Sequence, residues 1–184
     1  MSGDRDHNLP DPLSERFPEA ATQVPIVTTA YRFLHHFYTQ GDLAAAWMDV
    51  DPLLQMCWSQ WWTHANEQAL TAEGYEVEEA ATELARNADA HPLWRDFQRV
   101  ILRDFRAAHP LNVAKAGIGT TPRAIAPNVK LLYVHRQVPE GGRWEPGASS
   151  SAVPVVLHLD GERWKVMNLG YERIPEPGWP PTLA

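Results

Sequence analysis

The chain has 184 residues, of which 44% are hydrophobic and 21% charged, and its formal net charge at pH 7 is −7. This composition lies in the ordinary globular range and away from the disordered class, and the length fits a single domain. The acidic balance argues against binding to nucleic acid, because affinity for a phosphate backbone depends on clustered Lys and Arg.

The cysteine count and the lengths of apolar segments indicate the cellular compartment. Cys57 is the single cysteine, so no disulfide can form within the chain, and a reducing compartment is the simplest inference. The amino terminus is acidic and no apolar run follows it, unlike a signal peptide. No stretch approaches the roughly 18 to 20 consecutive apolar residues that a membrane helix needs. We therefore expect a cytoplasmic protein without membrane contact.

Both ends of the chain are rich in proline. Residues 1–23 have no sustained apolar period to anchor them to a core, so we expect a disordered tail there. Residues 172–184 form a proline-rich tail, because proline removes N–H donors and fixes φ, which excludes helix and central strand. We expect this tail to run extended over the surface, with Ile174 or Trp179 as its anchor. Residues 24–171 remain as one domain.

Helices are expected in the first half of this domain. Apolar residues recur there at spacings of three and four, which is the period of an amphipathic helix. Asp51 suits an N-cap and Pro52 the first helical turn. The expected helices run from about Pro25 to Gly41, over 43–48, from Pro52 to Gly74, over 77–88 and from His91 to Pro110.

A basic strip on the last of these helices alternates with aspartates, which predicts a solvated, salt-bridged face. The strip consists of Arg95, Arg99, Arg103 and Arg106, with Asp96 and Asp104 among them.

After the helices the apolar period changes from 3.6 to 2, which indicates strands. Residues 129–136 are apolar on both faces, so this strand is expected to be central and covered twice. Residues 153–159 and 162–169 flank Asp160-Gly161, the two-residue signature of a type I′ hairpin. The fold class is therefore α+β, with N-terminal helices packed against an antiparallel sheet.

The hairpin turn also predicts a register. Leu157 is expected opposite Trp164 and Val155 opposite Val166, with one face of the hairpin in the core and the other largely wet. Residues 139–151, rich in Gly, Pro and Ser, are expected to form a long mobile hairpin loop.

The order of these elements resembles the nuclear transport factor 2-like (SnoaL-like) superfamily. Two segments carry the likeness, Phe-Tyr-Thr-Gln-Gly-Asp-Leu-Ala-Ala-Ala-Trp at 37–47 and Val-Val-Leu-His-Leu-Asp-Gly-Glu-Arg-Trp-Lys-Val at 155–166. Pro-Leu-Trp at 92–94 and Gly-Ile-Gly-x-x-Pro-Arg at 117–123 look like actinobacterial members of the superfamily.

This resemblance implies a cone-shaped, cystatin-like roll, in which a strongly curved antiparallel sheet wraps over helices around an internal cavity. It also favours a homodimer, which we expect to form through the sheet. The superfamily includes isomerases, dehydratases, polyketide cyclases and non-enzymatic binding domains, so the fold alone does not give the function. The helices of residues 75–108 exceed the compact form of the superfamily.

An aromatic-lined pocket with a few polar groups is the usual profile of a small-molecule site. Tyr133 and His135 share one strand face, which the resemblance turns into the cone, and aromatic residues of the helices can meet them there. The alternative is an ordinary core, in which the polar groups of these side chains are hydrogen-bonded within the protein. The candidate ligand-binding residues are Tyr31, Trp58, Trp62, His64, Tyr133 and His135.

Acid–base chemistry has three candidate residues, His135, Asp49 and His64. A carboxylate pushed into an apolar cone has a raised pKa and can act as a general acid or base. Capping by Asp51 and a turn at Asp49 are the structural alternative for the two aspartates. Cys57 and His64 lie too far apart on one helix, roughly 10 Å along its axis, for the histidine to activate the thiol.

A metal or other cofactor is not expected. His35 and His36 are adjacent and would point about 100° apart on a helix, and no His-x-x-x-His spacing or cysteine cluster occurs.

The sequence leaves three functions open. The first is a non-catalytic domain that binds a small apolar or aromatic ligand or acts as a dimeric interaction module. The second is an isomerase, cyclase or hydrolase that uses His135 or Asp49 as a base. The third is an adaptor that binds through the tail around Trp179.

Overall fold

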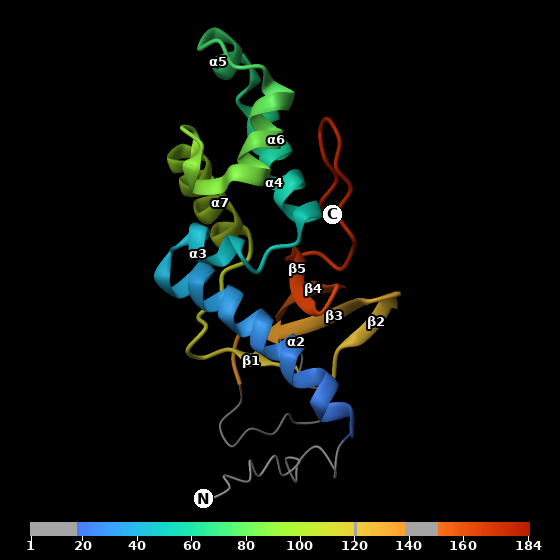
Figure 1. Ribbon diagram of the computed structural model, residues 1–184. Helices are drawn as coiled ribbons and strands as arrows, with labels where there is room; N and C mark the ends of the chain where they lie inside the picture. Colours follow the sequence, from blue (N-terminus) through green and yellow to red (C-terminus); the bar gives the residue numbers. More distant parts are fainter. Residues whose placement is uncertain (1–17, 120, 139–150) are drawn as a thin grey trace, which may run out of the picture.

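The computed structural model describes residues 18–119, 121–138 and 151–184. The protein is α+β, with helices first and a sheet after them, as expected. Figure 1 shows α4 to α7 as a helical lobe at one end of the molecule, and α2 lying across the sheet at the other end. The helices are α2 (Pro18–Leu34), η1 (His35–Gln40), α3 (Leu43–Trp47), α4 (Pro52–Ala65), α5 (Glu67–Ala72), α6 (Val77–Asn87), η2 (Ala88–Ala90) and α7 (Trp94–Ala108).

Helix α2 is longer than expected. It already includes Pro18 and passes through Pro25, where the sequence predicted its start. Glu19, Ala20 and Ala21 are strong helix formers, and their propensity extends the helix although no apolar period runs through them. The expected tail over residues 1–23 is therefore wrong from Pro18 onward, and the rest of it lies outside the described residues.

Helix α2 continues into the π-helix η1, which ends at Gly41 with a left-handed φ of 72°. Arg106 of α7 donates from Nε to the carbonyl oxygen of Phe37 in η1 at 2.9 Å. The prediction of a wholly solvated basic strip is wrong for this residue, because its guanidinium turns inward to that carbonyl. The predicted salt bridges do form elsewhere on the strip, from Arg99 to Asp96 and from Arg103 to Asp104.

The long helix expected after Pro52 is two helices. Helix α4 ends at Ala65, and Asn66 donates from Nδ2 to the carbonyl of Trp62 at 2.7 Å. Asparagine competes for backbone hydrogen bonds in this way and so favours helix ends over helix interiors. The predicted N-cap is confirmed, since Asp51 accepts the N–H of Leu53 at 2.9 Å.

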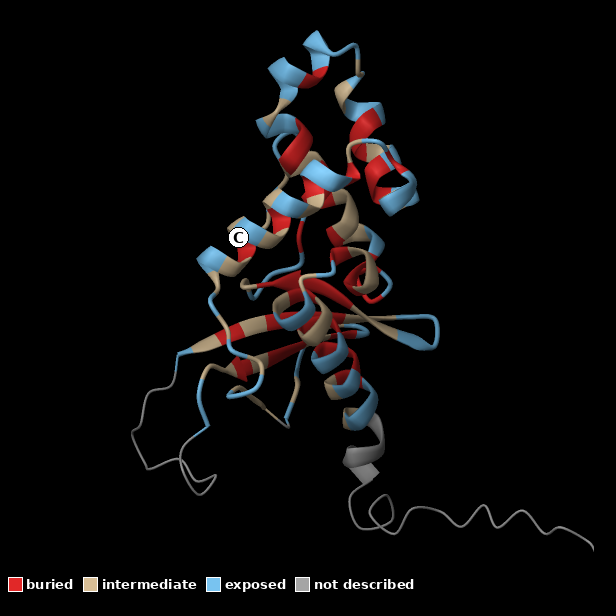
Figure 2. Ribbon diagram, turned by 90° about the vertical axis from the view of Figure 1, so that its left-hand side faces the viewer, coloured by how far each residue is buried: buried red, intermediate tan, exposed pale blue. Residues whose placement is uncertain are grey.

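The strands form one strongly curled antiparallel sheet, a half-barrel (Figure 2). Strand β3 is central, as predicted, because it pairs with β4 on one edge and with both β1 and β2 on the other. A bulge between Val156 and Leu157 interrupts the β4–β5 ladder, and bulges bend and twist a strand. The strands are β1 (Gly117–Ile118), β2 (Arg123–Ala126), β3 (Val129–His135), β4 (Ala152–Asp160) and β5 (Arg163–Leu169).

The β4–β5 hairpin is present, but its predicted register is wrong by two residues. Leu157 lies opposite Val166, and Leu159 opposite Trp164. Asp160 pairs with Arg163, so the turn residues are Gly161 and Glu162. Only Gly161 has a positive φ, of 61°, which is the pattern of a type II′ turn. Between the turn and the bulge, a shift of two keeps the side chains on their predicted faces. Beyond the bulge the register differs by three, since Val155 lies opposite Leu169, and Leu169 joins Val166 in the main core. The expected mobile loop lies outside the described residues except for its last residue.

Both faces of the sheet are covered, as the apolar pattern of β3 predicted. Leu132 and Val134 face the helices and belong to the main core. Leu131 faces the other way and packs with Val156 and Met167 in a smaller cluster. No helix among the described residues is both long and apolar enough to cross a membrane.

Candidate functional site

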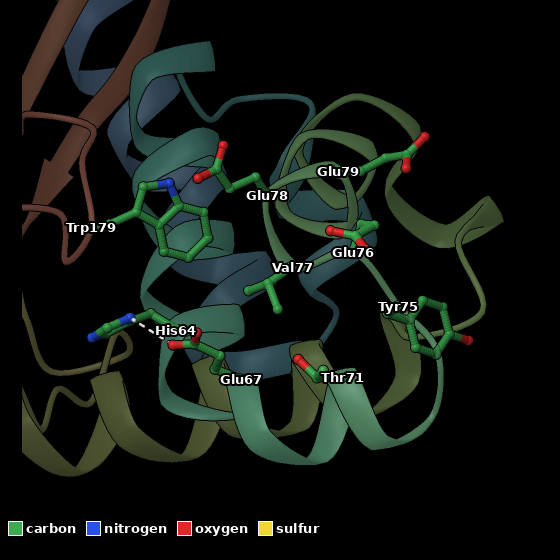
Figure 3. Close-up of a pocket in the computed structure, with 9 residues that line it drawn as sticks. All are labelled: His64, Glu67, Thr71, Tyr75, Glu76, Val77, Glu78, Glu79 and Trp179. Carbon is green, nitrogen blue, oxygen red and sulfur yellow. Dashed lines mark ion pairs between the residues drawn. The ribbon is translucent and has the colours of Figure 1, made fainter.

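An open cleft of about 800 Å³ lies beside the helical lobe, between α5, the start of α6 and the C-terminal segment (Figure 3). Most of its polar lining consists of carboxylates that are exposed to solvent. No Lys or Arg lines it, and within the described part of the chain none of these carboxylates pairs with Lys or Arg. The cleft is therefore a region of concentrated negative charge. The carboxylates are those of Glu67, Glu76, Glu78 and Glu79.

Aromatic side chains flank the acidic groups. Figure 3 shows Trp179 and His64 on one side of Val77 and Tyr75 on the other. The indole of Trp179 is 37% exposed, so part of its surface is open to a ligand. His64 lies 3.7 Å from a carboxylate oxygen of Glu67. The lining thus combines negative charge with flat apolar surfaces.

Two features of the sequence build this cleft. The break at Asn66 turns the chain from α4 into α5, and Gly74, with a φ of 88°, lets it turn again before α6. Both turns are short, so α5 and the acidic first turn of α6 stand close together. Glutamates in a first turn are stabilised by the helix dipole, which gives Glu78 and Glu79 a structural role as well.

The C-terminal segment folds back on α4 to complete the cleft. The N–H of Gly178 donates to Oε1 of Gln60 at 2.9 Å. Buried Asn168 donates to the carbonyl of Leu183 at 2.8 Å. The ring of Trp179 meets the ring of His64 with 6.0 Å between their centroids. Trp179 is thus one anchor of the segment, as the sequence suggested.

The other aromatic residues named as ligand-binding candidates are not gathered at this cleft. Trp58 and Trp62 are 0% and 4% exposed and pack in the main core. Tyr31 is 53% exposed on α2, where its ring stacks on His35. Of the helical candidates, His64 is the one that lines the cleft.

Tyr133 and His135 lie on the strand face that points away from the main core. Tyr133 packs against the smaller cluster, and its hydroxyl donates to Glu172 at 2.9 Å. His135 is two residues further along β3 and so shares this face. The expectation that this face looks toward the helices is wrong, because Leu132 and Val134 occupy the helix-facing positions. Their ligand-binding role remains a prediction.

Asp49 is held by structural partners. Its two carboxylate oxygens accept from Nε and a terminal nitrogen of Arg32 at 2.6 and 2.5 Å, which is a bidentate pair. Its carbonyl accepts the N–H of Val166 at 2.7 Å, while Val166 accepts the N–H of Asp51 at 2.8 Å. These bonds cover the outer edge of β5. Arg32 thus engages both oxygens of Asp49 and holds the carboxylate at the edge of the sheet.

Asp51 has two partners as well. One carboxylate oxygen caps α4, and the other lies 2.8 Å from Nδ1 of His158 on β4. This pair links the start of α4 to the sheet. Sequence reasoning explained the cap but missed His158, because no local pattern connects residues 107 positions apart.

Two further features that the sequence raised are the thiol of Cys57 and the possibility of a metal site. Cys57 is buried, and burial raises the pKa of its thiol to about 12, so it stays protonated at neutral pH. Within the described residues no group of three or more His, Cys, Asp or Glu is placed to hold a metal ion.

His109 is a half-buried residue that the sequence did not single out. It follows α7, and its Nε2 is buried without a hydrogen-bond partner among the described residues. Burial, and then the charge of Arg136, lowers the pKa of its imidazole. The apolar face of α7 is a signal that could have indicated His109, because it brings Phe105 and Ala108 to the end of the helix that His109 follows.

We expect this shift to make stability depend on pH. The unfolded chain binds a proton at His109 more readily than the folded chain, so the free energy of unfolding decreases as pH falls below about 6.5. The contribution is complete above that pH. Urea unfolding of wild type and His109→Gln between pH 7.5 and 5 measures it, and the variant should lose less stability on acidification. Parallel curves for the two proteins would contradict the assignment.

Comparison of the chain with protein-family models, curated proteins and solved structures finds no match.

Proposed function

We propose that the chain is a non-catalytic interaction domain of the nuclear transport factor 2-like class, whose acidic cleft takes a basic segment of a partner protein. The observation that carries this proposal is the set of four glutamates around an exposed indole, none of which pairs with Lys or Arg among the residues that the structure describes. A curled antiparallel sheet packed on helices supports the class.

The chemistry of the cleft favours a cation over an apolar ligand. Carboxylates that lack an internal partner attract Lys and Arg, and the net charge of −7 steers basic partners toward the chain. A cation that lies over the face of an indole gains a further ~0.5–1 kcal/mol at an exposed site. Trp179 offers such a face beside Glu78 in the lining.

The open shape of the cleft favours a peptide over a small molecule. Small-molecule sites bury most of their ligand and are mainly apolar. This cleft opens to solvent along exposed residues of α5 and α6, and four of its nine lining residues are glutamates. An extended segment can place several side chains along it while its backbone stays in water.

The experiment is a titration of the full chain with a fluorescent decapeptide of alternating Lys and Leu, followed by anisotropy. We expect Glu78→Gln/Glu79→Gln to weaken binding about tenfold, which corresponds to about 1.4 kcal/mol. The glutamines keep helix propensity while they remove charge. Binding should also weaken with added salt.

A matched control separates the cleft from the overall charge. Asp160→Asn/Glu162→Gln removes the same charge at the exposed β4–β5 turn and should leave the affinity within about twofold. Trp179→Ala should weaken binding by itself. If the two double variants bind the peptide equally, attraction is general to the surface and the cleft is not the site.

The homodimer through the sheet and the enzyme remain predictions outside this proposal. The smaller cluster on the outer face of the sheet is covered from within the chain by Leu53 and Ile125, so a second copy is not needed to bury it. Asp49, one of the two bases that the enzyme alternative named, forms a bidentate pair with Arg32. Light scattering on the full chain at micromolar concentration tests for the homodimer, since a single species of monomer mass would exclude it.

A further inference from the structure

A groove of about 510 Å³ lies where the start of α2 crosses the end of the sheet. Residues of α2, of the segment around β2 and β3 and of the β4–β5 hairpin line it, and none of these residues lines the acidic cleft. Figure 1 places α2 and β2 toward one end of the molecule, and the helices of the acidic cleft at the other. The groove is open to solvent on one side, so a ligand in it keeps one face in water.

The alternation of side chains along the strands brings the lining together on one face of the sheet. Lys130 lies two residues before Leu132, which faces the helices, so Lys130 shares this face. Leu159 lies directly opposite Trp164 in the β4–β5 ladder, and the indole of Trp164 packs against the main core. Ile26 of α2 belongs to the same core. The groove therefore lies at the rim of the core, where its apolar side chains are held in place but partly exposed.

A single positive charge lies in this lining. Among the described residues that line the groove, Lys130 is the one charged residue, and it is half-buried. None of the ion pairs within the described ranges includes Lys130. Asp160 and Arg163 follow and precede two lining residues, and alternation along the strands turns both to the opposite face. An ammonium group in this position attracts an anion, and its one charge matches one carboxylate.

The uncharged part of the lining favours an apolar body with a flat shape. Ile26, Leu159 and Trp164 offer apolar surface beside the ammonium group, and an indole favours an aromatic ring because stacking adds to the burial of its surface. The side-chain amides of Gln23 and Asn128 can donate hydrogen bonds to a carboxylate oxygen. Apolar surface with a few polar groups is the usual profile of a small-molecule site, whereas the four glutamates of the acidic cleft suit a segment with several cations.

We propose that this groove binds a small aromatic monocarboxylate, with its carboxylate paired to Lys130 and its ring against the indole of Trp164. The ligand class is acids with one carboxylate and a body of one or two rings. The net charge of −7 repels anions from the chain in general, so saturable binding of such an acid requires a local site. The groove is independent of the acidic cleft, so either can fail without the other.

Titration of the full chain with 2-naphthoate, followed by two-dimensional NMR, tests occupancy. The indole N–H signal of Trp164, assigned by its absence from the spectrum of Trp164→Phe, reports on the groove directly. For a ligand of this size we expect a saturable shift of that signal with a Kd of about 1 mM or below. The alcohol 2-naphthylmethanol has the same ring system without the charge, and should bind about threefold more weakly, as expected for the loss of one partly exposed ion pair.

Two pairs of variants test the charge. Lys130→Met keeps an unbranched apolar side chain and should abolish the preference for the acid over the alcohol. Arg163→Met removes the same charge from the opposite face of the hairpin and should keep that preference within about twofold. Gln23→Glu places a carboxylate in the lining and should weaken naphthoate binding about threefold, without affecting the alcohol. Val24→Glu is its matched control at the next, exposed position, outside the described lining.

Gln23→Glu also keeps the test decisive if Lys130→Met fails to fold, because it lies at a half-buried position of α2 and keeps the size of the side chain. Non-saturable shifts, or saturable shifts that leave the indole signal of Trp164 unchanged, would overturn the site. Equal affinity of wild type for naphthoate and naphthylmethanol, or equal loss of naphthoate binding in Gln23→Glu and Val24→Glu, would overturn the pairing with Lys130.

Discussion

Gly170→Ala is expected to lower the free energy of unfolding by about 3 kcal/mol. Gly170 has a φ of 85°, and an L-residue in the left-handed region loses about 1–2 kcal/mol. Its new Cβ would also overlap the imidazole of His109 at 2.1 Å, and overpacking a filled site costs about 1–3 kcal/mol more. The imidazole cannot simply swing away, because the rings of Phe105 and Tyr171 lie against it. Urea unfolding measures the loss.

Gly74→Ala separates the two contributions. Gly74 has a nearly equal φ of 88°, and a Cβ there meets nothing within 4 Å. This variant should cost only the backbone contribution, about 1 kcal/mol. Removing the ring in His109→Ala/Gly170→Ala should recover part of the lost stability, which a double-mutant cycle detects. If Gly170→Ala and Gly74→Ala cost the same, His109 does not pack over Gly170.

Local signals in the sequence were enough for most of the fold. The period of three and four placed the helices, the period of two placed the strands, and Asp51 marked the start of α4. These features succeed because each depends on residues within a few positions of one another. The double cover of β3 also followed, since apolar residues on both sides of a strand need two partners.

The errors occurred where two conformations differ little in local free energy. Asp160-Gly161 and Gly161-Glu162 can both make a two-residue turn, and pairing along the whole hairpin chose the second. Which face of β3 meets the helices was ambiguous for a similar reason. Leu131 and Leu132 are equally apolar, so only the helices decide that Leu132 faces them.

The candidate sites depend on contacts between distant segments. Trp179 and His64 meet because the C-terminal segment folds back through Asn168 and Gln60. His109 and Gly170 meet because the end of α7 lies against the end of β5. Neither contact has a signature in the spacing of residues, so the sequence suggested Trp179 only as an anchor and did not suggest His109.

Trp58→Ala is expected to destabilise the protein by about 4 kcal/mol, because removal of a buried aromatic side chain typically costs ~3–5 kcal/mol. Trp58 is 0% exposed, and its ring packs against three others. The centroid distances are 5.9 Å to Phe37, 6.1 Å to Trp47 and 4.9 Å to Phe105. Trp179→Ala is the matched control at a partly exposed indole, and should cost less than about 1 kcal/mol.

Trp58→Phe tells a core residue from a ligand-binding residue. The indole Nε1 of Trp58 is buried without a partner among the described residues, so its removal offsets part of the lost packing, and we expect a cost of about 1–2 kcal/mol. A ring that lines an open pocket would instead tolerate both substitutions. If Trp58→Ala unfolds at the same urea concentration as wild type, the aromatic cluster does not hold α4 to α7.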